Sequence, residues 1–562
     1  MSEPRRLLVL ALDAASPERI REWAADGSLP NIAALMGRGT RAATESVEGV
    51  YVGASWPSFV MGRGPGSHGV YWLDRILPGT YRRQRADGPA LAPFPALWDV
   101  LSDAGHRCVV LDVPLTPFSD RVTGPQVVEW GVHDAVFGFR TRPPELAAEI
   151  EARHGRHPAP AHCDADRSPE EARRFAEQLA AGAAARAGLT LDLLERTPDW
   201  RFAIQTFSET HCSGHQLWHT HDPAHPCHDP AGDDLLLQVF RAVDEAIGRI
   251  VDGVGPDTTV AVLALHGMGP AGGHGLLLQE VLQRLGLEVF EGGDPPEGAP
   301  MAVQPPPAPA PAPGAAADPA VGSAAGPSAG PSAGHTPRDL LRWGYRRLVP
   351  TALRERVYAW RQERNQRRGE GSPLGLDAAR TRAFYVGLGV GPPFSSIRLN
   401  LAGREPGGIV RPGAEADALI DELVGHLEAL TDVRTGAPAV ARVIRTDDLH
   451  PGERRDWLPD LLVEWTMTPP RGTTAAGLAR ESLWAIESPA LGRIEARNDY
   501  CRTGEHRRGG WVVVAGAGAR SAEVDRTLSV LDMAPTFAAM LGCEMPDREG
   551  EVVAELLDEA GR

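Results

Sequence analysis

Short apolar runs alternate with segments of helical periodicity along most of the chain, and this alternation constrains the fold more than any other feature. The expected strands are Leu7–Leu12, Cys108–Val113, Phe202–Phe207, Thr259–Leu265, Asp460–Trp465 and Trp511–Ala515. The expected helices are Ile32–Met36, Leu97–Ala104, Asp234–Val251, Leu276–Leu285, Ala414–Leu430 and Leu528–Leu541. Strands that alternate with helices build a mostly parallel sheet covered on both faces, so the sequence predicts an α/β fold.

A Pro-, Gly- and Ala-rich stretch at 292–337 interrupts this pattern. Such a composition buries too little apolar surface to offset the entropy of an ordered chain, so we expect a linker or a disordered loop. Residues 338–375 are rich in Arg and are expected to form a basic helical insertion, either a solvated helix face or a site for an anionic partner. The α/β core is then predicted in two parts, 1–291 and 376–562.

Charge and cysteine usage exclude several classes of protein. The formal net charge of −17 argues against a nucleic-acid binder, because phosphate-backbone affinity comes from Lys and Arg. The 6 Cys include no C-x-x-C pair, which excludes a disulfide scaffold or zinc ribbon and fits a reducing compartment. No apolar run reaches the ~20 residues that span a bilayer. We therefore expect a cytoplasmic protein without a membrane partner.

Ionisable side chains follow several of the expected strands. Asp13 ends the first strand, Glu209 and His211 follow Phe202–Phe207, and His266 follows Thr259–Leu265. In an open parallel sheet, ligands bind beyond the carboxyl ends of the strands. Carboxylates and imidazoles collected there suit Zn²⁺ or Mn²⁺, although an Asp after a strand is also a common turn residue or helix cap.

Two further features fit such a site. His211 and His215 are spaced i, i+4 and share one face if the segment is helical. Ser55 precedes Trp56 and Pro57 and is expected to start a short helix. A hydroxyl at a helix N-terminus meets the backbone N–H groups that bind phosphate, while the simpler alternative is a plain N-cap serine.

Taken together and in this order, the motifs resemble those of the alkaline phosphatase superfamily, most closely its type I phosphodiesterase/nucleotide pyrophosphatase-like branch. The motifs that carry the resemblance are Leu10-Ala-Leu-Asp13, Leu29-Pro-Asn-Ile32, Gly62-Arg-Gly-Pro-Gly-Ser-His-Gly69, Ser208-Glu-Thr-His-Cys-Ser-Gly-His215, Leu265-His-Gly-Met-Gly-Pro270, Thr503-Gly-Glu-His-Arg507 and Leu531-Asp-Met-Ala-Pro-Thr536. The resemblance implies an alkaline-phosphatase-like three-layer α/β/α sandwich with a mostly parallel central sheet and insertions. It also implies a two-metal phosphoesterase in which a Thr or Ser attacks phosphorus.

The resemblance assigns a role to each candidate residue. One metal site corresponds to His211, His215 and His506, and the other to Asp13, the Ser55 region, Leu265 and His266. Two cations about 4 Å apart would activate the nucleophile and stabilise the leaving oxygen.

Three positions depart from the family pattern. His211 stands where the family has Asp, and Glu209 is the candidate to supply the missing carboxylate. Leu265 replaces an Asp ligand, and leucine does not bind metals. Counting back from Gly62 at the family spacing reaches Val52, which has no nucleophilic group, so Ser55 is the predicted nucleophile and Tyr51 a further candidate.

The resulting prediction is a metal-dependent phosphoesterase that hydrolyses a phosphodiester or pyrophosphate bond of a small molecule through a phosphoserine intermediate. The predicted cofactor is Zn²⁺, one or two ions per chain, with Mn²⁺ as the alternative. Other functions left open are a phosphomonoesterase, a sulfuryl-transfer enzyme, a phosphomutase, or a degenerate binding protein with one metal or none. The sequence does not fix the oligomeric state.

Overall fold

The computed structural model describes residues 6–85, 91–132, 137–160, 163–165, 167–292, 372–387, 393–468, 483–497, 502–516 and 521–557. All of them belong to one unit, which joins residues before 304 to residues after 371. The predicted linker at 292–337 and the basic insertion at 338–375 lie almost wholly outside the described residues, so both stay predictions.

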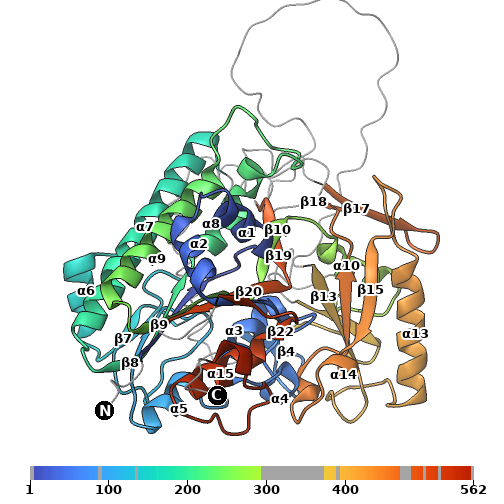
Figure 1. The fold of residues 1–562 in the computed structure, drawn as a ribbon. Coiled ribbons are helices and arrows are strands. Elements are labelled where there is room, and N and C mark those ends of the chain that lie inside the picture. Colours follow the sequence, from blue (N-terminus) through green and yellow to red (C-terminus); the bar gives the residue numbers. More distant parts are fainter. Residues whose placement is uncertain are drawn as a thin grey trace, which may run out of the picture. The chain divides into compact units, whose positions relative to one another are not determined.

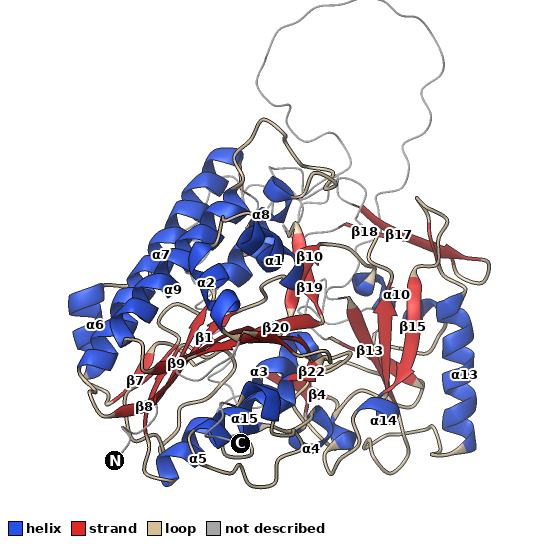
Figure 2. Ribbon diagram, viewed as in Figure 1, coloured by secondary structure: helices blue, strands red, loops and turns tan. Residues whose placement is uncertain are grey.

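A ten-stranded sheet forms the centre of this unit (Figures 1 and 2). Its strand order is β21-β2-β20-β9-β1-β8-β5-β6-β7, with β22 paired to β2. The strands are β1 (Arg6–Leu12), β2 (Thr40–Glu45), β5 (Arg107–Leu111), β6 (Gln126–Val128), β7 (Arg140–Arg142), β8 (Trp200–Phe207), β9 (Thr258–Ala264), β20 (Gly509–Ala515), β21 (Ala522–Glu523) and β22 (Leu528–Ser529). Strands β9, β1, β8, β5 and β6 are parallel, whereas β20 and β7 run antiparallel to their neighbours.

Helices cover both faces of this sheet because its central strands are apolar on both sides. In β1, Leu8, Leu10 and Leu12 face one core, and Leu7, Val9 and Ala11 face the other. The first core is covered by α1 (Pro17–Ala25), α2 (Pro30–Arg38), α6 (Leu146–His154), α7 (Pro169–Glu195), α8 (Glu209–His221) and α9 (Leu235–Val254). The second is covered by α3 (Tyr51–Met61), α5 (Leu97–Asp103) and α15 (Met533–Met540). This is the predicted three-layer α/β/α sandwich.

A smaller antiparallel sheet has its own core. Its order is β12 (Ala383–Val386), β13 (Phe394–Leu399), β16 (Leu461–Trp465) and β15 (Val440–Arg445). Helices α10 (Leu278–Arg284) and α13 (Ala414–Glu428) pack against it through apolar residues of a third cluster. Three minor sheets and two short helices complete the unit: β10 (Gly267–Pro270) with β19 (Gly504–Arg507); β11 (Ser372–Pro373), β4 (Arg82–Arg85) and β3 (Asp74–Ile76); β14 (Thr431–Asp432), β17 (Leu483–Ser488) and β18 (Gly492–Arg497); α4 (Pro65–His68) and α14 (Thr446–Leu449).

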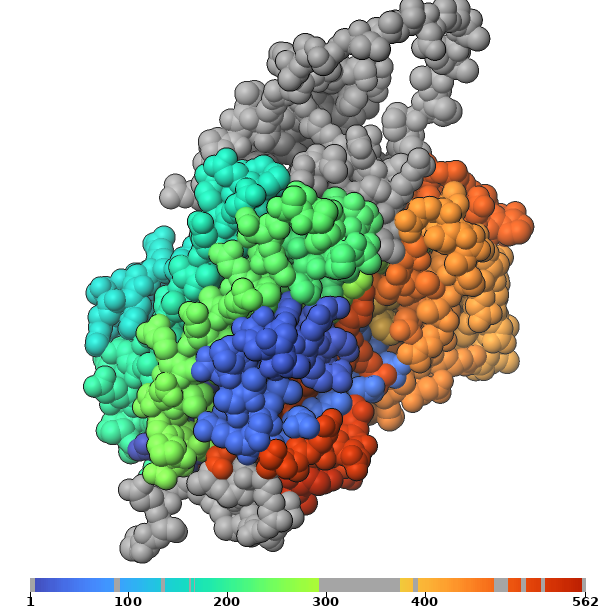
Figure 3. All heavy atoms as spheres, turned by 45° about the horizontal axis from the view of Figure 1, so that its top comes forward, coloured from blue at the N-terminus to red at the C-terminus, as the bar shows by residue number. Residues whose placement is uncertain are grey.

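Segments from the two ends of the chain lie together. Strand β2 pairs with β20, β21 and β22 from the C-terminal part. In the space-filling view, blue N-terminal and red C-terminal residues accordingly share one face (Figure 3). Residues after the long insertion therefore supply strands β20, β21 and β22 of the central sheet.

Most of the expected elements are present with ends shifted by a few residues. The predicted helix Leu528–Leu541 is wrong in its first part, because Leu528–Ser529 form β22 and a 3₁₀ turn at Val530–Asp532 precedes α15. The structure also joins Cys163 to Cys212 in a disulfide, a pairing that the cysteine spacing did not predict. Among the helices in the described part of the chain, none combines the length and the apolar character needed to cross a membrane.

A buried carboxyl group in the smaller core makes stability depend on pH. Burial raises the pKa of Glu288 to about 8, while one carboxyl oxygen accepts hydrogen bonds from the Tyr385 backbone N–H (3.1 Å) and from Gln279 (3.4 Å). At pH values above the ordinary pKa of a glutamate, Glu288 keeps its proton in the folded state and releases it in the unfolded state. The free energy of unfolding therefore falls by up to about 1.4 kcal/mol per pH unit as the pH rises toward 8.

We predict that Glu288→Gln, which is neutral at every pH, gains stability over the wild type progressively from pH 5 to pH 8. Urea unfolding at four pH values measures the difference. Glu291→Gln, at an exposed position, is the control and should follow the wild type throughout. Parallel pH curves for Glu288→Gln and the wild type would show that Glu288 is ionised in the folded protein.

Candidate metal centre

Three histidines from two distant segments meet at the carboxyl edge of the central sheet. His211 and His215 lie one turn apart on α8, which follows β8, and His506 lies on β19. Ligand atoms of the three rings all lie within 4.8 Å of one another. The Nε2 atoms of His215 and His506 are 3.1 Å apart, and the ring centroids of the three pairs are 4.5–5.0 Å apart. The structure thus brings together the three ligands predicted for the first metal site.

The orientation of His215 is fixed by the strand that carries His506. Its Nδ1–H donates to the Gly504 carbonyl at 2.8 Å, so its Nε2 presents a lone pair toward His506. The Thr503 backbone N–H in turn donates to the His215 carbonyl at 2.7 Å. A ligating histidine typically has such a partner on its second nitrogen, because the partner sets the tautomer and the ring orientation.

Burial keeps His215 and His266 neutral. It lowers the pKa of His215 well below its ordinary value, and the charges of Arg502, His211 and His506 act in the same direction. Burial also lowers the pKa of His266 to about 4. Neutral imidazole is the form that binds a cation, and three histidines are a known zinc ligand set. The donors present therefore fit one divalent cation.

Asp13 and His266 flank this cluster from the neighbouring strands. They follow β1 and β9, which pair in parallel, and the His266 ring lies 4.8 Å from the His506 ring between centroids. His266 is 2% exposed, and neither of its ring nitrogens has a hydrogen-bond partner among the described residues. Leaving two buried ring nitrogens unsatisfied is costly, which indicates that His266 faces a ligand.

The second metal site that the resemblance implies is poorly supplied with donors. Leu265 is 2% exposed and packs in the same apolar core as Tyr51. One oxygen of Asp13 accepts a hydrogen bond from the Trp56 indole N–H at 3.1 Å. Asp13 and His266 are the two candidates that remain, so the residues present do not fit a four-ligand second site.

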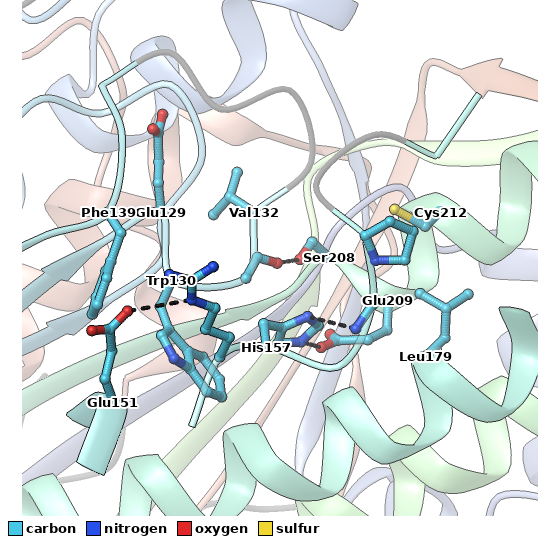
Figure 4. Close-up of a pocket in the computed structure, with 14 residues that line it drawn as sticks. Glu129, Trp130, Val132, Phe139, Glu151, His157, Leu179, Ser208, Glu209 and Cys212 are labelled. Atoms are coloured by element: carbon cyan, nitrogen blue, oxygen red, sulfur yellow. Dashed lines mark hydrogen bonds and ion pairs between the residues drawn. The ribbon is translucent and has the colours of Figure 1, made fainter. Parts of the chain in front are cut away.

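Glu209 is not brought into the histidine cluster. Its carboxylate accepts from Arg186 at 3.1 Å and lies 2.8 Å from His157 Nε2 (Figure 4). Although burial acts to raise it, the pKa of Glu209 is lowered by Arg186 and His157. Arg186 also donates to Asp112 at 2.7 Å, and all three charged side chains are fully buried. The structure therefore places Glu209 in a buried ion-pair cluster at the start of α8.

Ser55 does not start a helix as expected. Helix α3 begins at Tyr51, so Ser55 lies in its second turn and Pro57 inside it. An N-terminal position of Ser55 would put Pro57 in the first turn, but Pro57 lies in the helix interior, where its missing N–H leaves one backbone hydrogen bond unmade. Ser55 is 1% exposed, and its hydroxyl contacts the Tyr51 carbonyl and the Ser46 hydroxyl.

Tyr51, the further nucleophile candidate, contacts the histidine cluster. Its hydroxyl donates to the His506 carbonyl at 3.3 Å, and its ring lies 6.2 Å from that of His266 between centroids. Burial raises the pKa of Tyr51 far above its ordinary value, so the hydroxyl stays protonated. Val52, at the family spacing, is half-buried in the first turn.

The sequence did not single out the residues that support His506. Arg507 donates to the His506 carbonyl at 2.9 Å, and Arg502 donates to Asp164 through Nε at 2.9 Å and Nη2 at 2.8 Å. Burial raises the pKa of the neighbouring Glu505 to about 7. Glu505 and Arg507 lie in the same motif as His506, which was the available signal, whereas the partner of Arg502, Asp164, is far away in the chain.

Comparison with known proteins identifies the family. The sequence profile of the type I phosphodiesterase / nucleotide pyrophosphatase family matches residues 7–316, more than half of the chain. The chain therefore belongs to this family, which confirms the resemblance and the prediction of an enzyme of this class. A sequence search of curated proteins finds no match.

Two solved structures are similar to this chain. Phosphonoacetate hydrolase from Sinorhizobium meliloti 1021, in complex with phosphonoacetate, is 14% identical with a TM-score of 0.46, and the match covers 94% of each chain. Murine ectonucleotide pyrophosphatase / phosphodiesterase 5 is 11% identical with a TM-score of 0.45, and the match covers 97% of this chain and 98% of that one.

We predict that His506→Ala abolishes tight cation binding, because it removes one of three donors and the partner of His215. Elemental analysis after dialysis against Zn²⁺ measures the content. His228→Ala is the matched control: this histidine lies outside the cluster and is half-buried, so its replacement should leave the content unchanged. Equal losses in both variants would place the cation in the histidine-rich loop after α8.

Proposed function

We propose that this chain is a metal-dependent phosphoesterase that cleaves a phosphodiester or pyrophosphate bond of a small molecule. The observation that carries the proposal is the set of three buried imidazoles at the carboxyl edge of the sheet, with ligand atoms within 4.8 Å of one another. Zn²⁺ suits this donor set best, and Mn²⁺ is the alternative. When bound, such a cation supplies positive charge for the phosphoryl oxygens and lowers the pKa of an attacking or leaving hydroxyl group.

The proposed nucleophile is Ser55. Tyr51 and Ser55 are spaced i, i+4 and share a face of α3, and Tyr51 contacts His506 and His266 on that side. The next residue, Trp56, donates to Asp13, which ties this turn of the helix to the end of β1. Helix α3 is thereby held against the elements that carry the candidate ligands.

The chain's own groups account for the steps of this proposal. The Ser55 hydroxyl gives up its contact with the Tyr51 carbonyl, and its oxygen bonds to phosphorus as the bond from phosphorus to the leaving oxygen breaks; the hydroxyl proton passes, directly or through water, to that leaving alcohol or phosphate. A water oxygen then bonds to phosphorus as the Ser55 Oγ–P bond breaks, and one proton of that water returns to Oγ.

Hydrolysis of bis-p-nitrophenyl phosphate with added Zn²⁺ or Mn²⁺ tests the function. We expect turnover by the wild type and a loss of at least about 100-fold in kcat for both His506→Ala and Ser55→Ala, because each removes a group required for the chemical step. Tyr51→Phe should retain turnover and thereby separate the two hydroxyl candidates. Full activity in Ser55→Ala would overturn the phosphoserine route, and no turnover with either cation would overturn the hydrolase.

A second candidate function is a degenerate relative that binds one cation and its ligand without turnover. The burial of Leu265 in an apolar core, where the family has a ligand, is the observation that favours it. A site without the second cation loses part of the charge that stabilises the leaving oxygen.

Leu265→Asp separates these functions. A buried carboxylate without a partner destabilises the fold, so we expect a lower Tm in chelator and its recovery when Zn²⁺ supplies the partner. Leu265→Ala, the control, creates a cavity that no cation repairs. A gain of one Zn²⁺ per chain and of turnover would indicate a weakened hydrolase, whereas a gain of metal alone would support the binding protein.

A cytoplasmic location stays a prediction from composition. The Cys163–Cys212 disulfide argues against a permanently reducing compartment.

A further inference from the structure

The disulfide is attached to the helix that carries two of the three histidines. Cys212 directly follows His211 on α8, and Cys163 lies before α7, 49 residues earlier in the chain. Cys163 is fully buried and Cys212 is 4% exposed. The covalent bond therefore fastens Cys163 and its neighbours to the first turn of α8, beside the candidate metal centre.

Residues next to Cys163 also hold the segment that carries the third histidine. Both carboxylate oxygens of Asp164 accept from Arg502, which lies four residues before His506. Arg502 itself lies 3.5 Å from Glu505, the neighbour of His506. Through Asp164, the chain at Cys163 is thus connected to the strand β19.

A second contact ties the same region to α8. Gln216, which follows His215, donates to Asp164 at 3.3 Å and accepts from Arg167 at 2.5 Å. The Arg167 guanidinium also lies over the Phe175 ring of α7 at 3.8 Å. Cys163, Asp164 and Arg167 therefore connect α8, which carries His211 and His215, to the segment of β19, which carries His506. We call Cys163, Asp164 and Arg167 the clasp.

A pocket gives small molecules a route to the disulfide. It has a volume of about 460 Å³ and is lined by Trp130, Phe139, Leu179, Cys212 and others. Figure 4 shows the Cys212 sulfur at the edge of this pocket, across from the Glu209–His157 pair. Cys212 lines this pocket and is 4% exposed, so the pocket is the side from which a small thiol would approach the disulfide.

We propose that the Cys163–Cys212 disulfide is a redox modification site, and that its oxidation state sets the cation affinity of the three-histidine centre through the clasp. This inference rests on the proposed function of that centre. Reduction is by a small dithiol: its thiolate attacks one sulfur to give a mixed disulfide, and its second thiol displaces the protein thiol. Cys163 and Cys212 gain two electrons and two protons, and the dithiol becomes a disulfide.

Reduction removes the covalent link to α8 and leaves non-covalent ones: the contacts of Asp164 and Arg167, and the hydrogen bonds that join His215 to Thr503 and Gly504. A histidine ligand whose supporting contacts are weakened loses orientation, and such changes typically lower metal affinity 10–100-fold. The reverse exchange, in which the disulfide form of the small dithiol accepts the two electrons and two protons, re-forms the Cys163–Cys212 bond and restores the tighter centre.

The test is Zn²⁺ binding by equilibrium dialysis against a competing chelator. We expect the Cys163→Ser/Cys212→Ser variant to bind at least about ten-fold more weakly than the oxidised wild type. Cys227→Ser, which replaces a partly exposed cysteine outside the disulfide, should bind like the wild type. Wild type reduced with dithiothreitol and desalted without oxygen should match the double variant, and the double variant should not respond to that treatment.

Three results would overturn the inference: equal affinity of the double variant and the oxidised wild type, equal affinity of reduced and oxidised wild type, or free thiols at both positions in peptide mass spectrometry after treatment with oxidised dithiothreitol. Should the double variant fail to fold by circular dichroism, Asp164→Asn carries the test, because it keeps the disulfide and weakens the link to Arg502. That variant should bind Zn²⁺ more weakly, with an unchanged spectrum. If the oxidised wild type binds no more Zn²⁺ than His506→Ala does, the proposed function of the centre fails, whatever the effect of reduction.

Discussion

Strand β1, buried on both faces and paired in parallel with β8 and β9, is the constraint on which the candidate site depends. Parallel strands end at the same edge of a sheet, so Asp13, the start of α8 and His266 emerge side by side from three distant parts of the chain. Burial of the apolar residues of β1 fixes this arrangement of strands. The arrangement in turn fixes where the polar groups at the strand ends lie.

The start of α8 is fixed by charge as well as by the sheet. Arg186 on α7 is fully buried and donates to Asp112, Glu209, the Ser208 hydroxyl and the Gly131 carbonyl. Removing one partner from such a cluster typically costs about 3–5 kcal/mol, because the remaining charges stay buried without compensation. Glu209 therefore anchors the helix that carries His211 and His215. Its carboxylate pairs with Arg186 and His157 inside this cluster.

The candidate metal centre has one well-supplied and one poorly supplied position. Three buried imidazoles from α8 and β19 converge; the His506 carbonyl accepts hydrogen bonds from Tyr51 and Arg507, and the Gly504 carbonyl accepts one from His215. At the neighbouring position Leu265 offers no donor, and the Trp56 indole N–H donates to one oxygen of Asp13. We therefore expect one bound cation at this edge of the sheet rather than two.

The sequence by itself determined the class of fold and the order of the site motifs, because apolar periodicity and strand-end polar residues are local properties of the chain. It also identified His211, His215 and His506, whose residue type already limits their chemistry. Only the tertiary structure decided that Glu209 pairs with Arg186, that Ser55 lies in the second turn of α3, and that Cys163 joins Cys212. Each of these depends on a partner or a helix start that no local pattern specifies, since burial and long-range packing select among the contacts that one side chain can make.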